Sequence, residues 1–190
     1  MSRARASGTR PSRLAGIATR SAIVLAGLVF ATGARAECNR EMLQQLADTY
    51  VAAQAAGDPA MLPLAERSYY GENDRPVAIA EGVLSQALTV DFTRSLLDTT
   101  LCATFTELVA ATHAHPYVIH TRMEANAEGK LTVIESVVTD EDDWVFGAEP
   151  FLGYTTQEDW SEIPEDQRNV RPALQAAADA YINNWGDPFL

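Results

Sequence analysis

The clearest pattern in the chain is an apolar repeat at three- and four-residue steps between residues 39 and 56. This period is typical of an α-helix with one buried face. Asn39 suits the N-cap of this helix, and Gly57 suits its end. A second, short helix is predicted over 58–65, where Pro63 limits its length. The apolar residues that make the repeat of the first helix are Met42, Leu43, Leu46, Tyr50, Val51 and Ala53.

Farther along, apolar and polar residues alternate over 96–111, 117–125 and 131–139, which predicts three strands. An earlier strand is expected to begin at 68–70, before the turn-like segment 71–76. Residues 82–92 suit either a short helix or a strand. Asn126–Gly129 predict a hairpin turn, with Gly129 at the position that needs a positive φ. Helices followed by a meander of antiparallel strands predict an α+β fold with one helix-covered sheet face.

The last third of the chain returns to helix. Residues 140–164 are acidic, aromatic and rich in turn formers, so we expect a surface loop with little regular structure. A helix is predicted over 165–185, and its sequence Ala178–Ile182 resembles Ala47–Val51 of the first helix. Both segments run on to Gly-Asp-Pro. Two interpretations remain open: a chance likeness of alanine-rich helices, or the start of a truncated second copy in 165–190.

The N-terminal residues 1–36 have the composition of a signal peptide. They contain six arginines and no acidic residue, followed by a short apolar run and Ala34-Arg35-Ala36. That final triplet matches an A-x-A cleavage pattern. The apolar run is shorter than the roughly 20 residues that cross a bilayer. We therefore expect a secreted or periplasmic protein that starts near Glu37 and has no membrane association after cleavage.

Cleavage would leave an unusually acidic chain. Six of the 14 basic residues and none of the 26 acidic ones lie in residues 1–36, so the formal charge changes from −12 to −18. Such a surface repels phosphate backbones, which argues against nucleic acid as a partner. The remaining length suits one domain, residues 37–164, followed by the C-terminal helix. Cys38 and Cys102 are expected to form a disulfide after export, the alternative being two buried thiols.

Residues 49–59, TYVAAQAAGDP, resemble the opening of the nuclear transport factor 2-like superfamily, which includes ketosteroid isomerases and SnoaL-type cyclases. The resemblance implies a curved antiparallel sheet wrapped by helices into a cone with an apolar pocket. The segments 94–108 and 115–119 are similar to uncharacterised secreted proteins, common in fungi, of the same superfamily. That similarity implies the fold and brings no activity with it.

The resemblance to ketosteroid isomerases also implies roles for three residues. Tyr50 matches the tyrosine that stabilises an oxyanion, and Asp74, sixteen residues after Asp58, matches the proton-abstracting aspartate. Thr121 stands where those enzymes have a protonated aspartic acid as second donor, and a hydroxyl does not replace a carboxyl of raised pKa. Two ordinary interpretations stand beside these roles: Asp74 as a turn residue and Tyr50 as a packing residue.

Two glutamates interrupt apolar strand faces. Glu107 shares a face with Phe105, and Glu135 interrupts the apolar face of 131–139. A carboxylate there is costly unless it is paired or lies at a pocket wall. If adjacent strands bring the two together, they share a proton; alternatively, a bulge turns one outward. The predicted ligand pocket is lined by Glu107, Glu135, Phe105 and Ile119.

No cofactor or metal is predicted. His113 and His115 form an H-x-H pair without a clear third ligand, and His120 is expected in solvent on a polar strand face. The acidic run 140–143 lacks the spacing of a known calcium loop. We expect a protein that binds a small, largely apolar molecule. The alternatives are a cofactor-free isomerase, cyclase or dehydratase that uses an Asp base, and a structural module that forms homodimers.

Overall fold

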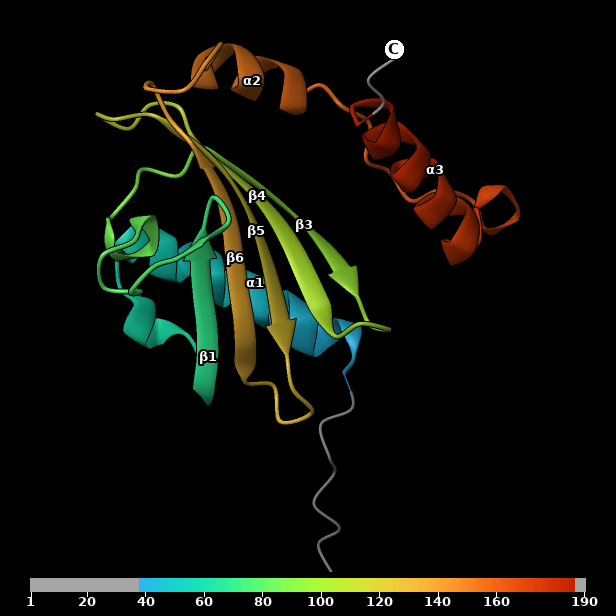
Figure 1. Cartoon of the computed structure of the whole chain (residues 1–190), viewed down its shortest axis with the longest axis horizontal. Coiled ribbons are helices and arrows are strands. Elements are labelled where there is room, and N and C mark those ends of the chain that lie inside the picture. Colours follow the sequence, from blue (N-terminus) through green and yellow to red (C-terminus); the bar gives the residue numbers. More distant parts are fainter. Residues whose placement is uncertain (1–37, 187–190) are drawn as a thin grey trace, which may run out of the picture. The chain divides into compact units, whose positions relative to one another are not determined.

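A computed structural model describes residues 38–186 of the chain (Figure 1). The signal peptide predicted over 1–36 and the last four residues lie outside this part. No helix within the described residues is long and apolar enough to span a membrane. The elements are α1 (Arg40–Ala56), η1 (Pro59–Met61), β1 (Leu64–Glu72), β2 (Arg75–Pro76), η2 (Val83–Ser85), β3 (Phe92–Asp98), β4 (Ala103–Ala110), β5 (Tyr117–Ala125), β6 (Leu131–Thr139), α2 (Ala148–Thr155), η3 (Glu165–Gln167) and α3 (Arg171–Asn184).

The sheet has six strands in the order β2-β1-β6-β5-β4-β3. Strands β3 to β6 form the predicted antiparallel meander. Strand β1 lies parallel to β6, so the sheet as a whole is mixed. A parallel pair needs a long crossover, and here β2 to β5 supply it. The α+β class predicted from the pattern is confirmed.

Helix α1 begins and ends where the sequence predicts. The Asn39 side chain accepts a hydrogen bond from the Met42 N–H at 2.9 Å, which caps the first turn. Gly57 ends the helix with φ 64°, and a Cβ atom there would lie 2.4 Å from the Ala87 nitrogen. Only glycine fits that turn. The helix passes behind the strands in the view of Figure 1 and buries Leu43 and Leu46 against them.

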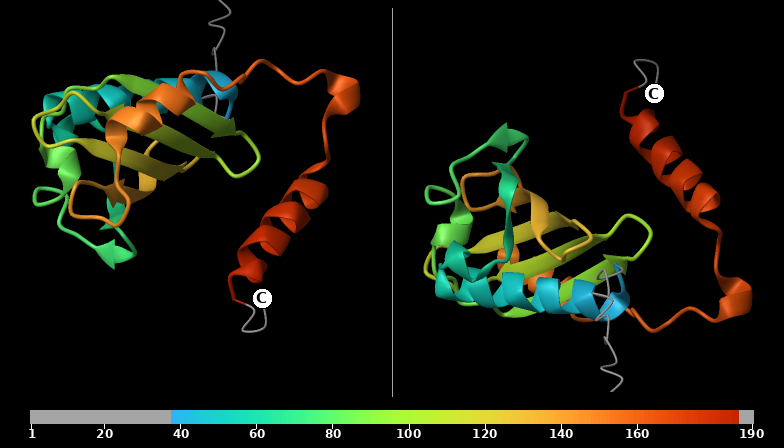
Figure 2. Two further views of the ribbon diagram at one scale, coloured as in Figure 1. Left: turned by 90° about the horizontal axis from the view of Figure 1, so that it is seen from above. Right: turned by 90° about the horizontal axis from the view of Figure 1, so that it is seen from below.

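Alternation along the strands produces two chemically different faces. The helix face, covered by α1, carries buried residues such as Leu108, Ile119 and Ile134. The opposite face, called the open face below, carries charged and exposed residues along the same strands. At one end of the open face, Val109 and Val118 pack against Ala148 of α2. Figure 2 shows α1 and α2 as separate layers against the strands.

The disulfide between Cys38 and Cys102 is present, as predicted. It joins the residue before α1 to the turn between β3 and β4, with Cα atoms 5.5 Å apart. By the chain-entropy argument, closing so long a loop contributes roughly 4 kcal/mol. The bond is consistent with an oxidising, extracellular location.

Several predicted boundaries are wrong. The segment 96–111 is not one strand, because a turn at 99–102 separates β3 from β4. The loop expected over 140–164 contains helix α2, which is stabilised by tertiary contacts of Phe151 and Leu152. The helix over 58–65 is reduced to η1. The undecided segment 82–92 contains only the short η2 and the first residue of β3. The last helix is α3, which has no buried residue.

Candidate functional site

A hollow of about 240 Å³ lies on the open face, and residues from four strands and one turn line it. We call it the open-face hollow. Its position follows from strand register, because Phe105 of β4 pairs with Arg122 of β5, which pairs with Glu135 of β6. Side chains that are directly opposite in neighbouring strands point to the same face. The residues whose chemistry matters here are Tyr69, Asp74, Phe105, His120, Arg122 and Glu135.

Asp74 reaches this hollow because of the turn that carries it. Asn73 and Asp74 both have positive φ, 50° and 60°, which is the conformation of a tight two-residue hairpin turn. The Asn73 side chain fixes this turn to β6: its Oδ1 accepts from the Val138 N–H at 2.9 Å, and its Nδ2 donates to the Val138 carbonyl at 3.0 Å. Asp74 makes no ion pair within residues 38–186. Its carboxylate charge is therefore available to a ligand.

Arg122 is the positive group of the hollow, and two carboxylates hold it. Its guanidinium donates to Glu135 Oε2 at 3.1 Å and also binds Glu124. Burial opposes the charge of Arg122, but the bonds to both glutamates outweigh that effect and raise its pKa. Glu135 and Phe105, two of the residues predicted to line a ligand pocket, both line this hollow.

His120 also lines the open-face hollow, where it is half-buried rather than in solvent as expected. Its ring stacks on Phe105 at a centroid distance of 5.8 Å and meets the edge of Phe151, from α2, at 6.1 Å. Burial lowers the pKa of His120, the Glu107 charge opposes that effect, and Arg94 adds to it. The imidazole is therefore neutral at pH 7. Its surroundings come from α2, which the strand pattern alone does not reveal.

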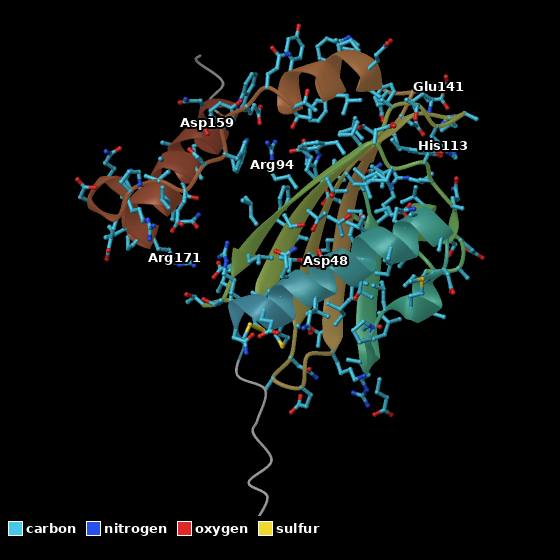
Figure 3. All side chains as sticks on the ribbon, turned by 180° about the vertical axis from the view of Figure 1, so that it is seen from behind. Asp48, Arg94, His113, Glu141, Asp159 and Arg171 are labelled. Carbon is cyan, nitrogen blue, oxygen red and sulfur yellow. A yellow bond between two sulfur atoms is a disulfide. The ribbon has the colours of Figure 1, made fainter. Side chains whose placement is uncertain are left out.

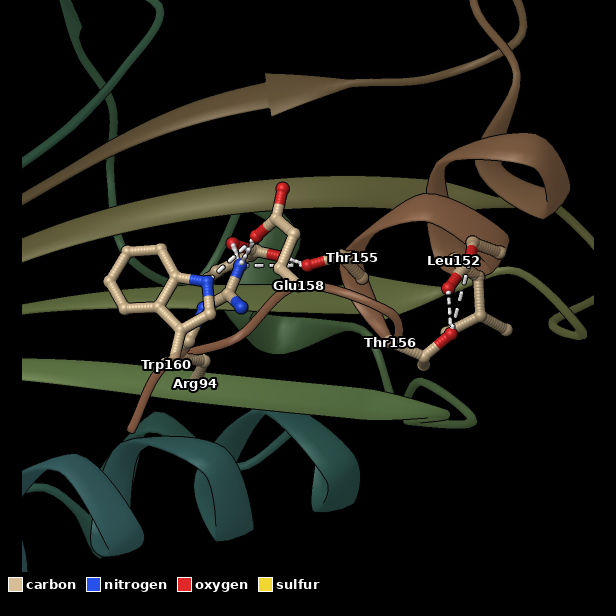
Figure 4. Close-up of polar contacts among 8 residues, drawn as sticks. Arg94, Leu152, Thr155, Thr156, Glu158 and Trp160 are labelled. Atoms are coloured by element: carbon tan, nitrogen blue, oxygen red, sulfur yellow. Dashed lines mark hydrogen bonds and ion pairs between the residues drawn. The ribbon is translucent and has the colours of Figure 1, made fainter. Parts of the chain in front are cut away.

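Glu107 is buried but fully paired. Figure 4 labels Arg94, Thr155, Glu158 and Trp160 of the cluster around it. Its Oε2 accepts from Arg94 at 2.8 Å, and its Oε1 accepts from the Thr155 hydroxyl at 2.5 Å. Arg94 also donates to Thr155 and Glu158 and stacks on the Trp160 ring at 3.9 Å. This cluster fastens the end of α2 to β3 and β4. Because β5 lies between β4 and β6, Glu107 and Glu135 are not neighbours and share no proton.

Tyr50 and Thr121 come together as the resemblance implies, but on the helix face. The Tyr50 hydroxyl lies 2.6 Å from Thr121 Oγ1, which lies 2.8 Å from Ser136 Oγ. Burial raises the pKa of Tyr50 to about 12, with a smaller contribution from the Glu72 charge and an opposing one from the Thr121 hydrogen bond. Tyr50, Thr121 and Ile119 are all fully buried. None of the three lines the open-face hollow, so the proposed site residues are divided between two faces.

Glu72 is a carboxylate on the helix face that was not predicted as a site residue, and its charge acts on Tyr50. Glu72 Oε1 accepts from the Val83 N–H at 2.6 Å and from the Tyr70 hydroxyl. Burial and then the hydrogen bond to Glu72 raise the pKa of Tyr70. Since these bonds tie η2 to β1, the arrangement serves the fold. The alternation that places Tyr70 inward also predicts Glu72 inward.

The two histidines of the H-x-H pair contact different partners. His113 Nδ1 accepts from the Thr89 N–H at 3.2 Å, whereas His115 lies between Asp140 at 3.2 Å and Glu141 at 3.1 Å. The hydrogen bond to Asp140 is the main cause that raises the pKa of His115. His113 and Glu141 lie at the same end of the strands (Figure 3). No group of three or more metal-ligating side chains occurs among the described residues.

A larger hollow, of about 410 Å³, lies beside the turn between β3 and β4. Phe105 lines it together with Leu96 and Leu101. Its charged groups are already matched, because both terminal nitrogens of Arg171 donate to Asp98 at 2.7 Å and Arg122 pairs with two glutamates. The open-face hollow is the better candidate site, since it contains a carboxylate without an ion pair.

Comparison with known proteins adds little to this geometry. No protein-family model matches the chain, and no curated protein matches it. One solved structure with similarity is a protein of unknown function with a cystatin-like fold from Methylobium petroleophilum PM1. The two are 12% identical with a TM-score of 0.41, over 66% of this chain and 97% of the other.

Proposed function

We propose that this chain is an exported binding protein for a small molecule, and that the molecule lies in the open-face hollow. The observation that carries the proposal is the composition of the hollow. It combines the unpaired carboxylate of Asp74 with the aromatic rings of Tyr69 and Phe105. Concave sites that mix apolar surface with a few placed polar groups are the usual form of ligand sites.

The signal-peptide composition of residues 1–36 and the Cys38–Cys102 disulfide support export. The geometry does not favour the alternative in which Asp74 and Tyr50 act together as base and hydrogen-bond donor. Asp74 lines the open-face hollow, whereas the Tyr50 hydroxyl is buried against Thr121 on the helix face. A shared substrate would have to contact both faces of one sheet.

Native mass spectrometry on the protein purified from its export compartment tests this proposal. Val137 lines the hollow and is 57% exposed, so Val137→Trp fills the site without entering the core. Leu174→Trp is the matched control, because Leu174 of α3 is also 57% exposed and lies outside the hollow. We expect a bound molecule on the wild type and on Leu174→Trp, and none on Val137→Trp. A wild type without any bound molecule, or equal occupancy of all three proteins, contradicts the proposal.

A second candidate is a subunit interface on the same face. Exposed apolar side chains gather there, with Leu96 at 48%, Phe105 at 42% and Val137 at 57% exposure. Contiguous exposed apolar surface is typical of association sites. Light scattering over a concentration series distinguishes the two functions. A dimer that Val137→Trp dissociates supports the interface, and a monomer at all concentrations excludes it.

A further inference from the structure

A second hollow, of about 260 Å³, lies beside the open-face hollow, where β5 approaches α2. We call it the α2 hollow. Its walls are mainly apolar, and one carboxylate, Asp143, lies among them. His120 is the one described residue that lines both hollows, and we call its side chain the partition between them. The apolar residues that line the α2 hollow are Val118, Trp144, Val145, Phe146 and Phe151.

The partition is held by packing alone. His120 lies between the rings of Phe105 and Phe151, and within residues 38–186 no hydrogen bond to its imidazole is present. A side-chain rotation of His120 therefore breaks stacking contacts and no polar bond. A ligand that passes the imidazole would replace one set of apolar contacts with another, at small cost.

The charges of the two hollows favour a cation. In the open-face hollow the charge of Arg122 is matched by Glu135 and Glu124, which leaves the Asp74 carboxylate uncompensated. In the α2 hollow Asp143 is the charged group. Tyr69 and Phe105 line the open-face hollow, and aromatic rings attract organic cations. The acidic chain as a whole concentrates cations and repels anions.

We propose that the two hollows form one bipartite site for an amphipathic organic cation. Its positively charged head lies beside Asp74, and its apolar body passes His120 and rests on Phe146 and Phe151. This inference rests on the proposed function and names the ligand class that the site selects. The open-face hollow supplies charge recognition, and the α2 hollow supplies the buried apolar area.

Titration calorimetry with three probes tests the ligand class. Decyltrimethylammonium has both the head and the body, tetramethylammonium has only the head, and decyl sulfate has the body with the opposite charge. We expect decyltrimethylammonium to bind at least about tenfold more tightly than either other probe. Equal affinity for decyltrimethylammonium and decyl sulfate overturns the choice of a cation.

Substitutions test the two halves of the site separately. Asp74→Asn should weaken both cationic probes about tenfold, whereas Asp179→Asn, a matched change on exposed helix α3, should weaken neither. Phe151→Ala should weaken binding of decyltrimethylammonium and leave binding of tetramethylammonium unchanged. Because Phe151 also helps to hold α2, Trp144→Ala serves as the second variant; Trp144 is 96% exposed, and its loss cannot unfold the core.

The outcomes separate this inference from the proposed function. If Val137→Trp abolishes decyltrimethylammonium binding while Phe151→Ala and Trp144→Ala leave it unchanged, the ligand uses one hollow and the bipartite site is wrong. If native mass spectrometry finds a neutral or anionic molecule that Val137→Trp excludes, the cation assignment fails and the binding function stands. If Val137→Trp changes neither the occupancy seen by native mass spectrometry nor the affinity for decyltrimethylammonium, the proposed function and the bipartite site are both wrong.

Discussion

The two faces of the β3–β6 sheet are built from alternate residues of the same strands, yet they have opposite properties. On the helix face, Ile119 and Thr121 are fully buried, and the polar groups there bind one another. On the open face, His120 and Arg122 line a hollow that remains accessible. Stability is therefore concentrated on one face, which leaves the other free to carry a ligand site.

The largest expected effect is a difference in stability between substitutions at two consecutive residues, Ile119 and His120. Ile119→Ala removes a fully buried side chain and should lower the free energy of unfolding by about 2–5 kcal/mol. His120→Ala, one residue later on the opposite face, should lower it by about 1 kcal/mol or less. Urea unfolding followed by circular dichroism measures both. Similar losses for the two variants would show that the open face contributes as much to stability as the helix face.

The next prediction tests the place where the open face behaves like a core. The side chain of Glu107 is only 12% exposed and is held by Arg94 and Thr155, so Glu107→Gln should cost about 1–3 kcal/mol. The matched change is Glu135→Gln, whose side chain is 52% exposed and pairs with Arg122. It should cost about 0–1 kcal/mol. Thermal unfolding of both variants is the measurement, and a reversed order would contradict the assignment of Glu107 as a fastening residue.

The contrast between these glutamates also shows how far the sequence predicts the molecule. Alternation correctly places Glu107 with Phe105 on one face, and caps predict the ends of α1. Alternation says nothing about which strands are neighbours, so it cannot tell that Arg94 meets Glu107 while Arg122 meets Glu135. It also misses α2, whose apolar residues gain their partners only from the folded sheet.

Alternation and spacing also fail to predict that the site residues implied by the resemblance lie on two different faces of the sheet. Tyr50 and Thr121, to which the resemblance to ketosteroid isomerases gives related roles, lie in contact because both belong to the helix-covered core. Asp74 is one of the two central residues of a turn, both with positive φ, and that turn directs it to the open face. The number of residues between two positions does not reveal the direction in which such a turn leads the chain. Position in a motif and position in a site can therefore differ.

A smaller effect is expected from the buried tyrosine on the helix face. Because the pKa of Tyr50 is raised to about 12 in the folded protein, the folded state keeps its proton longer than the unfolded state, whose value is near 10. This stabilisation is fully present below pH 10 and is lost as the pH rises toward 12. Tyr50→Phe should reduce the loss of stability over that range, whereas Tyr154→Phe, at an exposed position of α2, should not. Identical pH profiles for the two variants would contradict the burial of the Tyr50 hydroxyl.

The smallest stability effect, and the sharpest comparison, is expected from Arg122→Gln. Its pairs with Glu124 and Glu135 are partly exposed, so their loss should cost about 0–1 kcal/mol. The substitution also removes the one positive charge that lines the open-face hollow and leaves Glu135 unpaired beside Asp74. Binding of decyltrimethylammonium should therefore tighten several-fold while the unfolding midpoint hardly changes, and added salt should diminish the gain.

Arg171→Gln, which removes a guanidinium bound to Asp98 outside this hollow, is the control and should leave the affinity unchanged. If Arg122→Gln weakens the cation instead, then Arg122 holds the shape of the site, and the open face depends on its own packing as the helix face does.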